Sequence, residues 1–281
     1  MVFYTQQSLK KNLEEFAFHE KKMGFVPTMG ALHEGHLALV KKALKENDLV
    51  IVSIFVNPTQ FDNPSDLKKY PRTLTEDLRL LNTLKRTVLV YAPNASDLYG
   101  NTVSSKHYHF GGIENQMEGK FRKGHFNGVG TVLNLLFRAI APHKAYFGEK
   151  DFQQLQIVKK LVKIEQLPVK IIGCPIKRET NGLAMSSRNK RLTQTQFEEA
   201  SIIYKTLKEV QQNFDKKSIA TLHKIVAKQF SKNKHLTLEY FEIAAIKNLK
   251  PAHRKIKENT YRAFIAAFAG EVRLIDNIAL N

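Results

Sequence analysis

Two histidines three residues apart, His33 and His36, have the type and spacing best suited to chemistry in this chain. They follow an apolar, strand-like run that ends at Pro27, and they precede an amphipathic pattern over residues 37–45. We therefore expect both at the start of a helix. Residues three apart share a helix face, and a helix start presents unpaired N–H groups and partial positive charge. Such a place favours a polyphosphate over a metal ion.

A second polar segment follows the apolar run 49–56, where Asn57 and Gln60 come just past an expected buried strand. A plain structural role is a turn with a surface amide, since Asn-Pro pairs favour turns. The alternative is a binding role, because a side-chain amide can donate and accept hydrogen bonds at the same time.

Two cationic segments come later in the chain. Lys150 follows the strand-like run 144–147 and precedes a helical pattern, a position from which a cation reaches phosphates. Its alternative is an exposed ion pair with Glu149 or Asp151, which would stabilise little. The loop 186–188 combines two hydroxyl groups with a guanidinium, whose fork of donors matches phosphate. The alternative for this loop is a serine-rich connector between domains.

The elements that must position these residues alternate between strands and helices over the first two-thirds of the chain. The expected strands are 25–26, 49–56, 87–91, 144–147 and 169–173, and the expected helices are 37–45, 75–85, 128–140 and 152–166. Continuous apolar strands between helices predict a parallel sheet covered on both faces. Ligands of such sheets bind beyond the carboxyl ends of the strands, where the polar segments fall.

The pattern changes after about residue 176. Lysine-rich amphipathic helices are expected at 193–214 and 218–232, and strands at 237–243 and 261–268. We therefore predict an α/β fold with two domains. Residues 1–176 would form a Rossmann-like parallel-sheet domain that binds a nucleotide. Residues 177–281 would form a smaller α+β domain that carries the phosphate loop 185–188.

Composition narrows the class of protein. The 281 residues, 43% of them hydrophobic, suffice for a sizeable core. No run approaches the ~20 apolar residues that cross a bilayer, and the first residues lack the pattern of a secretory signal. The single cysteine, Cys174, excludes an intramolecular disulfide framework. We expect a cytoplasmic protein without a membrane partner.

The formal net charge of +18 raises the possibility of a nucleic-acid-binding protein. That class predicts binding with a steep dependence on salt concentration. The lysines are scattered, however, without a block of five like charges and without an RNA-binding aromatic motif. This scatter is typical of a solvated surface with a general lysine bias, so an enzyme is favoured over a nucleic-acid-binding protein and no nucleic-acid partner is expected.

Residues 27–36 resemble the HxGH element of the nucleotidylyltransferase superfamily, which class I aminoacyl-tRNA synthetases share. With the segments 53–61, 147–154 and 182–189, the chain is similar to the pantothenate synthetase (pantoate–β-alanine ligase) family. The nearest alternative is another HxGH enzyme, such as a cytidylyltransferase or a small synthetase fragment, which would activate a different acid or a phosphate ester.

The resemblance implies an ATP-dependent condensation of (R)-pantoate with β-alanine to pantothenate. Pantoate would attack ATP to give pantoyl adenylate and pyrophosphate, and β-alanine would then displace AMP. The resemblance also implies Mg²⁺ bound with ATP, no tightly bound organic cofactor and a homodimer. No covalent enzyme intermediate is needed, so the lack of a nucleophile arrangement is no objection.

The resemblance also implies roles for individual residues. His36 would be the principal catalytic histidine, assisted by His33, with Lys150 and Arg188 binding phosphates. Residues expected to bind ATP are Met29, Gly30, His33, His36, Gly148, Glu149, Lys150, Asp151, Lys177, Met185, Ser186, Ser187 and Arg188. Residues expected to bind pantoate or β-alanine are Gln60, Gln154 and Asn57. No residue is expected to ligate a metal ion directly.

Four positions depart from the family pattern. Thr59 stands where methionine or leucine is common, Lys123 replaces a proline, Leu135 a lysine and Arg138 an asparagine. The change at Thr59 affects the wall of the expected pocket. The changes at Leu135 and Arg138 affect helix-surface contacts more than chemistry, and His125 is expected to be structural.

Overall fold

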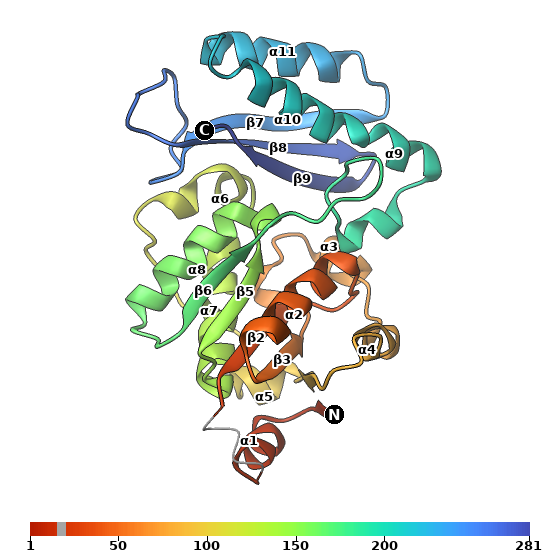
Figure 1. The fold of residues 1–281 in the computed structure, drawn as a ribbon, viewed down its shortest axis with the longest axis vertical. Coiled ribbons are helices and arrows are strands. Elements are labelled where there is room, and N and C mark those ends of the chain that lie inside the picture. The colour runs from red at the N-terminus through yellow and green to blue at the C-terminus, as the bar shows by residue number, and fades with distance from the viewer. Residues whose placement is uncertain (16–20) are drawn as a thin grey trace. The chain divides into compact units, whose positions relative to one another are not determined.

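The computed structural model describes residues 1–15 and 21–281, which form two compact units (Figure 1). The first unit consists of Met1–Phe110, Glu118–Glu149 and Gln154–Pro175. The second consists of Gly111–Met117, Lys150–Gln153 and Ile176–Asn281. The second unit therefore takes two short segments from the part of the chain that otherwise builds the first.

A six-stranded parallel sheet forms the centre of the first unit. In spatial order its strands are β1 (Val2–Phe3), β4 (Leu89–Tyr91), β3 (Leu49–Ile54), β2 (Met23–Thr28), β5 (Lys144–Gly148) and β6 (Lys170–Cys174). All neighbours pair in parallel. The strand order reverses between β2 and β5, which is the position where such folds bind nucleotides. The predicted Rossmann-like α/β architecture is confirmed.

Helices occupy the connections between these strands. They are α1 (Gln6–Glu15), α2 (Glu34–Glu46), α3 (Pro64–Lys69), α4 (Leu74–Asn82), α5 (Ala95–Tyr99), α6 (Met117–Phe121), α7 (His125–Ile140) and α8 (Phe152–Ile164). Among the residues described, no helix has the length and apolar character needed to cross a membrane.

Strand β2 shows why both faces of the sheet are covered. Val26 joins the buried cluster that contains Leu37 and Val40 of α2. Phe25, the preceding residue, packs edge-on against Phe137 of α7 with ring centroids 6.0 Å apart. Because successive side chains of a strand point to opposite faces, α2 and α7 cover opposite sides. The sheet is therefore buried between helical layers, as its continuous apolar strands predict.

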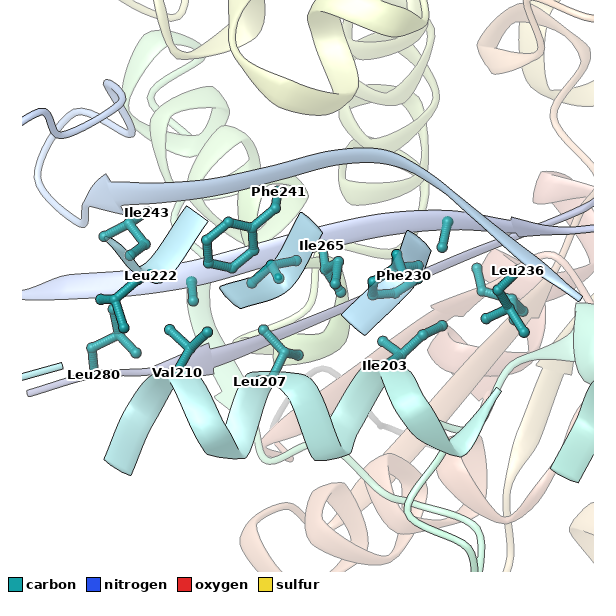
Figure 2. Close-up of a cluster of buried hydrophobic side chains, with 14 of the residues drawn as sticks. Ile203, Leu207, Val210, Leu222, Phe230, Leu236, Phe241, Ile243, Ile265 and Leu280 are labelled. Carbon is teal, nitrogen blue, oxygen red and sulfur yellow. The ribbon is translucent and has the colours of Figure 1, made fainter. Parts of the chain in front are cut away.

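A three-stranded antiparallel sheet forms the second unit together with its helices. The strands are β7 (Leu236–Ala245), β8 (Tyr261–Ala269) and β9 (Val272–Ala279) in the order β7-β8-β9. The helices are α9 (Gln194–Glu199), α10 (Ser201–Asn213) and α11 (Ile219–Ser231). Figure 2 shows Leu207 of α10 and Leu222 of α11 in one buried cluster with Phe241 and Ile265 of the sheet. This unit matches the predicted smaller α+β part.

Residues 193–214 are not one helix as predicted. The chain turns at Ala200, whose N–H donates to the carbonyls of both Gln196 and Glu198. Ala200 is also fully buried. The tight turn separates α9 from α10, and the periodicity of the two short helices gave no sign of it.

Candidate active site

The turn after β2 has a backbone that few residues can adopt. Gly30 has φ +79° and Ala31 has φ +49°. The hydroxyl group of Thr28 donates to the carbonyl of Ser53 at 2.7 Å and accepts from the N–H of Gly30 at 3.2 Å. A Cβ at residue 30 would lie 3.0 Å from the carboxylate of Asp77, so this position needs glycine for its angle and for its space.

Asp77 of α4 holds the same turn through its main chain. Its carboxylate accepts from the N–H of Ala31 at 3.0 Å and from the N–H of Leu32 at 2.7 Å. The hydroxyl group of Thr73 adds a third bond at 3.2 Å. Only 2% of Asp77 is exposed. A buried carboxylate that accepts main-chain N–H groups makes strong, directional bonds, so α4 fixes the chain just before His33.

His33 and His36 stand at the start of α2, as predicted. His33 is the N-cap residue, and its Nδ1 accepts from the N–H of Gly35 at 3.1 Å. The Nδ1 of His36 accepts from the N–H of His33 at 3.3 Å, and the two ring centroids are 4.1 Å apart. Since each Nδ1 is an acceptor in this network, the proton of each neutral ring is assigned to Nε2. Both rings therefore offer an Nε2–H donor.

Asn57 and Gln60 are buried, which excludes the surface-amide alternative. The Nδ2 of Asn57 donates to the Oε1 of Gln60 at 3.1 Å and to the carbonyl of Gly128 at 3.2 Å. The Nε2 of Gln60 lies 3.2 Å from the Sδ of Met29. Burial raises the pKa of Tyr99, whose hydroxyl group donates to Asn57 Oδ1 at 2.5 Å. The structure thus brings Asn57 and Gln60 to the β2–α2 turn.

The turn η2 (Pro58–Gln60) is fixed from the side of α7 as well. The Nδ1 of His125 donates to the carbonyl of Gln60 at 2.8 Å, and Arg122 donates to the same oxygen at 3.4 Å. A Cβ on Gly128 would lie 2.3 Å from the carbonyl oxygen of Thr59. Only glycine at that position lets α7 approach the turn so closely.

Strand β5 ends at Gly148, beside β2 at the reversal of strand order. The turn η4 (Glu149–Asp151) follows, and Gln154 lies half-buried in the first turn of α8. The Nζ of Lys150 is 3.6 Å from a carboxylate oxygen of Asp151, so the ion pair considered above is present. The side chain of Lys150 is nevertheless only 19% exposed, unlike that of a surface pair.

In the second unit, Lys177 and Met185 face each other across a short hairpin. The N–H of Met185 donates to the carbonyl of Lys177 at 3.0 Å. Ser186 then caps the turn η5 (Ser187–Arg191), with its hydroxyl group accepting from the N–H of Arg188 at 3.2 Å. The predicted phosphate loop is therefore an ordered turn of its unit and not a plain connector.

The positions that depart from the family pattern have separate surroundings. Thr59 lies 3.0 Å from the hydroxyl group of Tyr99, within the Asn57 network. Arg138 lies on the exposed surface of α7 and pairs with Glu165 at 2.9 Å. Lys123 is exposed. The departure at Thr59 therefore contacts Asn57, one of the residues expected to bind an acid.

Across residues 1–15 and 21–281, no group of three or more His, Cys, Asp or Glu side chains is placed to hold a metal ion. Among the candidate site residues, His33, His36, Lys150 and Arg188 carry hydrogen-bond donors or cations, which are groups that bind anions.

The sheet order and the histidine-capped helix at its reversal define a nucleotide-binding α/β enzyme with an HxGH element. The sequence model described as pantoate-beta-alanine ligase matches residues 1–279, and the chain belongs to this family. It is therefore a ligase. This match excludes the cytidylyltransferase and synthetase-fragment alternatives.

Individual relatives agree over the full length. The chain is 54% identical over 280 residues to the pantothenate synthetase of Christiangramia forsetii, covering 100% of this chain and 99% of that one. The crystal structure of pantothenate synthetase from Thermus thermophilus superposes with a TM-score of 0.91 at 35% identity, covering 99% of each chain. A second crystal structure is that of the Francisella tularensis pantoate-beta-alanine ligase, complexed with "Beta-gamma ATP" and β-alanine. It superposes with a TM-score of 0.81 at 38% identity, covering 100% of this chain and 97% of that one.

Proposed function

We propose that this chain joins (R)-pantoate to β-alanine in an ATP-dependent reaction that passes through pantoyl adenylate and releases AMP and pyrophosphate. Family membership supports the two organic substrates, and the ATP-type ligand and β-alanine of the Francisella neighbour support the co-substrates. The observation that carries the proposal is the pair of histidines at the start of α2. Each is bonded through Nδ1 to the main chain, so each presents Nε2–H.

In the first half-reaction the carboxylate of pantoate attacks the α-phosphorus of ATP, and pyrophosphate leaves. His36 and His33 donate from Nε2 to phosphate oxygens, where negative charge grows in the transition state. Lys150 and Arg188 bind phosphate oxygens as cations. The protein supplies no nucleophile, and its contribution is positioning and charge stabilisation.

Nucleotide binding draws on main-chain and side-chain groups in this proposal. We assign it to the turn after β2, the turn after β5 and the hairpin with its phosphate loop. The residues are Met29, Gly30, Gly148, Glu149, Asp151, Lys177, Met185, Ser186 and Ser187, beside the four named above. Mg²⁺ would arrive with ATP, held mainly by its phosphates, as this cation commonly is.

The acid is recognised by amides in this proposal. Gln60 has two N–H groups, of which one is directed to Met29, and the other donates to the carboxylate of pantoate. Asn57 holds the Oε1 of Gln60 and so fixes the amide in that orientation. Gln154 contributes a second amide. In the second half-reaction the amine of β-alanine attacks the acyl carbon of the adenylate, and AMP leaves.

One assay tests the proposal directly. AMP should be released only when ATP, Mg²⁺, pantoate and β-alanine are all present. Exchange of labelled pyrophosphate into ATP should depend on pantoate and not on a panel of other hydroxy acids. Exchange with another acid, but none with pantoate, would overturn the proposal. Light scattering would test the proposed homodimer, and fractionation the proposed cytoplasmic location.

A further inference from the structure

Strand β9 contacts two segments that carry proposed phosphate-binding residues. We propose that Asp276 and Asn277 are positioning residues for the adenylation step. In this inference, which rests on the proposed function, Asn277 fixes the main chain at Lys150, and Asp276 fixes the hairpin that leads to Arg188. Neither β9 residue is expected to touch a substrate.

The two residues act on opposite faces of the three-stranded sheet. In the β8–β9 ladder, Asp276 lies opposite Ile265, and Asn277 lies opposite Phe264. Ile265 belongs to the core that α10 and α11 cover, whereas Phe264 packs against Phe152, with ring centroids 6.0 Å apart. Since consecutive strand residues point to opposite faces, adjacent positions can hold two segments that are far apart in sequence.

Asp276 fixes Arg178 by two parallel hydrogen bonds. Nη1 of Arg178 donates to Oδ2 at 2.6 Å and Nη2 to Oδ1 at 3.1 Å, and the carboxylate side chain is 1% exposed. The same guanidinium donates to the carbonyl of Gly182 at 3.0 Å and lies 3.7 Å from the ring centroid of Tyr204. Gly182 has φ +93°, and a Cβ there would lie 2.8 Å from Tyr204. Arg178 and the turn at Gly182 are thus held as one body.

The hairpin transmits this position to the phosphate loop. Arg178 forms an antiparallel bridge with Ala184. Met185 bonds through its N–H to the carbonyl of Lys177 at 3.0 Å. Residues 186–188 follow directly in the chain. The contact between Asp276 and Arg178 is therefore linked to the loop that carries Arg188 through Ala184 and Met185, which are both paired across the hairpin.

Asn277 fixes the second segment by its main chain. Its Nδ2 donates to the carbonyl of Lys150 at 2.8 Å, and its Oδ1 accepts from Arg262. The guanidinium of Arg262 lies 4.0 Å from the ring centroid of Phe152. One amide therefore joins β9, β8 and the segment Lys150–Gln153. An apolar residue at this position would pack but would not orient the carbonyl of Lys150.

The chemistry of these contacts points to positioning. Buried ionic pairs are poor sources of stability, because desolvation offsets their attraction, and apolar replacements often stabilise as well or better. Such pairs instead fix the orientation of the groups that they bind. Displacing a reacting or phosphate-binding group by about 1 Å can cost about a hundredfold in rate. The cluster is thus better suited to holding two phosphate-binding segments in register than to stabilising the core.

The test separates the two half-reactions. Asn277→Asp is nearly isosteric, keeps an acceptor for Arg262 and removes the donor to Lys150. We expect pantoate-dependent pyrophosphate exchange at saturating ATP to fall about tenfold to a hundredfold. The reaction of β-alanine with supplied pantoyl adenylate should change less than about threefold, because pyrophosphate has already left. Asn277→Ser, which is smaller and uncharged, should show the same split.

Glu239→Gln is the matched control. Glu239 of β7 accepts from Arg273, which lies on the same strand as Asn277, at 2.6 Å, and the Glu239 side chain is 16% exposed. It should leave both half-reactions unchanged. If the rates of both half-reactions fell equally in the Asn277 variants, or if these variants adenylated at the wild-type rate, this inference would be overturned and the proposed function would stand. Absence of pantoate-dependent exchange in the wild-type enzyme would overturn the proposed function and this inference with it.

Discussion

The main-chain N–H of Leu32 donates to the buried carboxylate of Asp77 at 2.7 Å, one residue before the histidine that caps α2. This contact joins α4 to the start of α2. The imidazole positions therefore depend on a side chain from a different helix, through a turn whose backbone is otherwise unfavourable for Ala31.

Replacing Asp77 by Asn should loosen this turn. The amide keeps the shape but presents a donor to one of two main-chain N–H groups, which leaves a buried donor unpaired at a cost of about 1 to 3 kcal/mol. Adenylation should slow about tenfold or more, because the histidines lose their fixed position. Urea unfolding and pyrophosphate exchange measure the two effects. Glu76→Gln, at the exposed neighbouring position, should change neither.

Variants of His36 can distinguish its structural role, as acceptor for the N–H of His33, from its proposed catalytic role as a donor to phosphate. The Oδ1 of an asparagine can replace Nδ1 as acceptor for the N–H of His33, whereas a glutamine amide reaches the position of Nε2 as a donor. We expect His36→Asn and His36→Ala to lose about 10² to 10³-fold in adenylation rate, and His36→Gln to lose clearly less. Pantoate-dependent pyrophosphate exchange is the measurement. Equal rates in the Gln and Asn variants would contradict a donor role.

Gln60→Ala should raise the KM for pantoate about tenfold or more, because a hydrogen bond to a charged group is worth about 1.5 to 3 kcal/mol. The KM for ATP should stay within about twofold. Steady-state kinetics with each substrate varied in turn distinguishes the cases. An equal rise of the KM values for pantoate and ATP would indicate a folding defect and contradict the proposal that Gln60 binds pantoate.

Gly128→Ala should push α7 away from the Pro58–Gln60 turn, because the new Cβ would lie 2.3 Å from a main-chain carbonyl. Overpacking of this kind costs about 1 to 3 kcal/mol, and the KM for pantoate should rise with it. The matched variant is Gly130→Ala on the same helix, whose Cβ would meet side-chain rings at 3.0 Å or more. Equal thermal stability of the two variants would contradict the prediction.

The decrease in the free energy of unfolding at acidic pH should depend on His223. Burial, with a smaller effect of His253, lowers the pKa of His223 below its ordinary 6.5. The fold therefore favours the neutral ring, and the unfolded chain binds a proton first as the pH falls. The stability that the fold gains from a neutral His223 is fully present above pH 6.5. It is lost as the pH falls from 6.5 through the lower pKa that His223 has in the folded protein. Urea unfolding at about pH 8 and about pH 5.5 should show a smaller decrease in His223→Gln than in the wild type.

The sequence predicted well those features that are local in the chain. The apolar strands and the histidine-capped helix follow from neighbouring residues, and the structure has them where expected. Strand β9 was not predicted, because the buried polar pair Asp276–Asn277 interrupts its apolar pattern. The two-residue β1 is too short to carry a pattern at all.

The supports of the site were not predictable in the same way. Asp77 is one acid among others in a helical pattern, and its partner Ala31 lies 46 residues away. Asp276 and Arg178 are 98 residues apart. Such contacts depend on the packing of whole elements, and no spacing rule within a segment reveals them.

The segment Lys150–Gln153 has a consequence for any attempt to divide this protein. It is joined by peptide bonds to the strand and helix of the first unit, yet its carbonyl and aromatic contacts are with β8 and β9. Two fragments made by cutting after Pro175 would part the carbonyl of Lys150 from the amide of Asn277. Neither fragment alone would retain the complete second unit, so activity from such a split chain would require the pieces to reassociate.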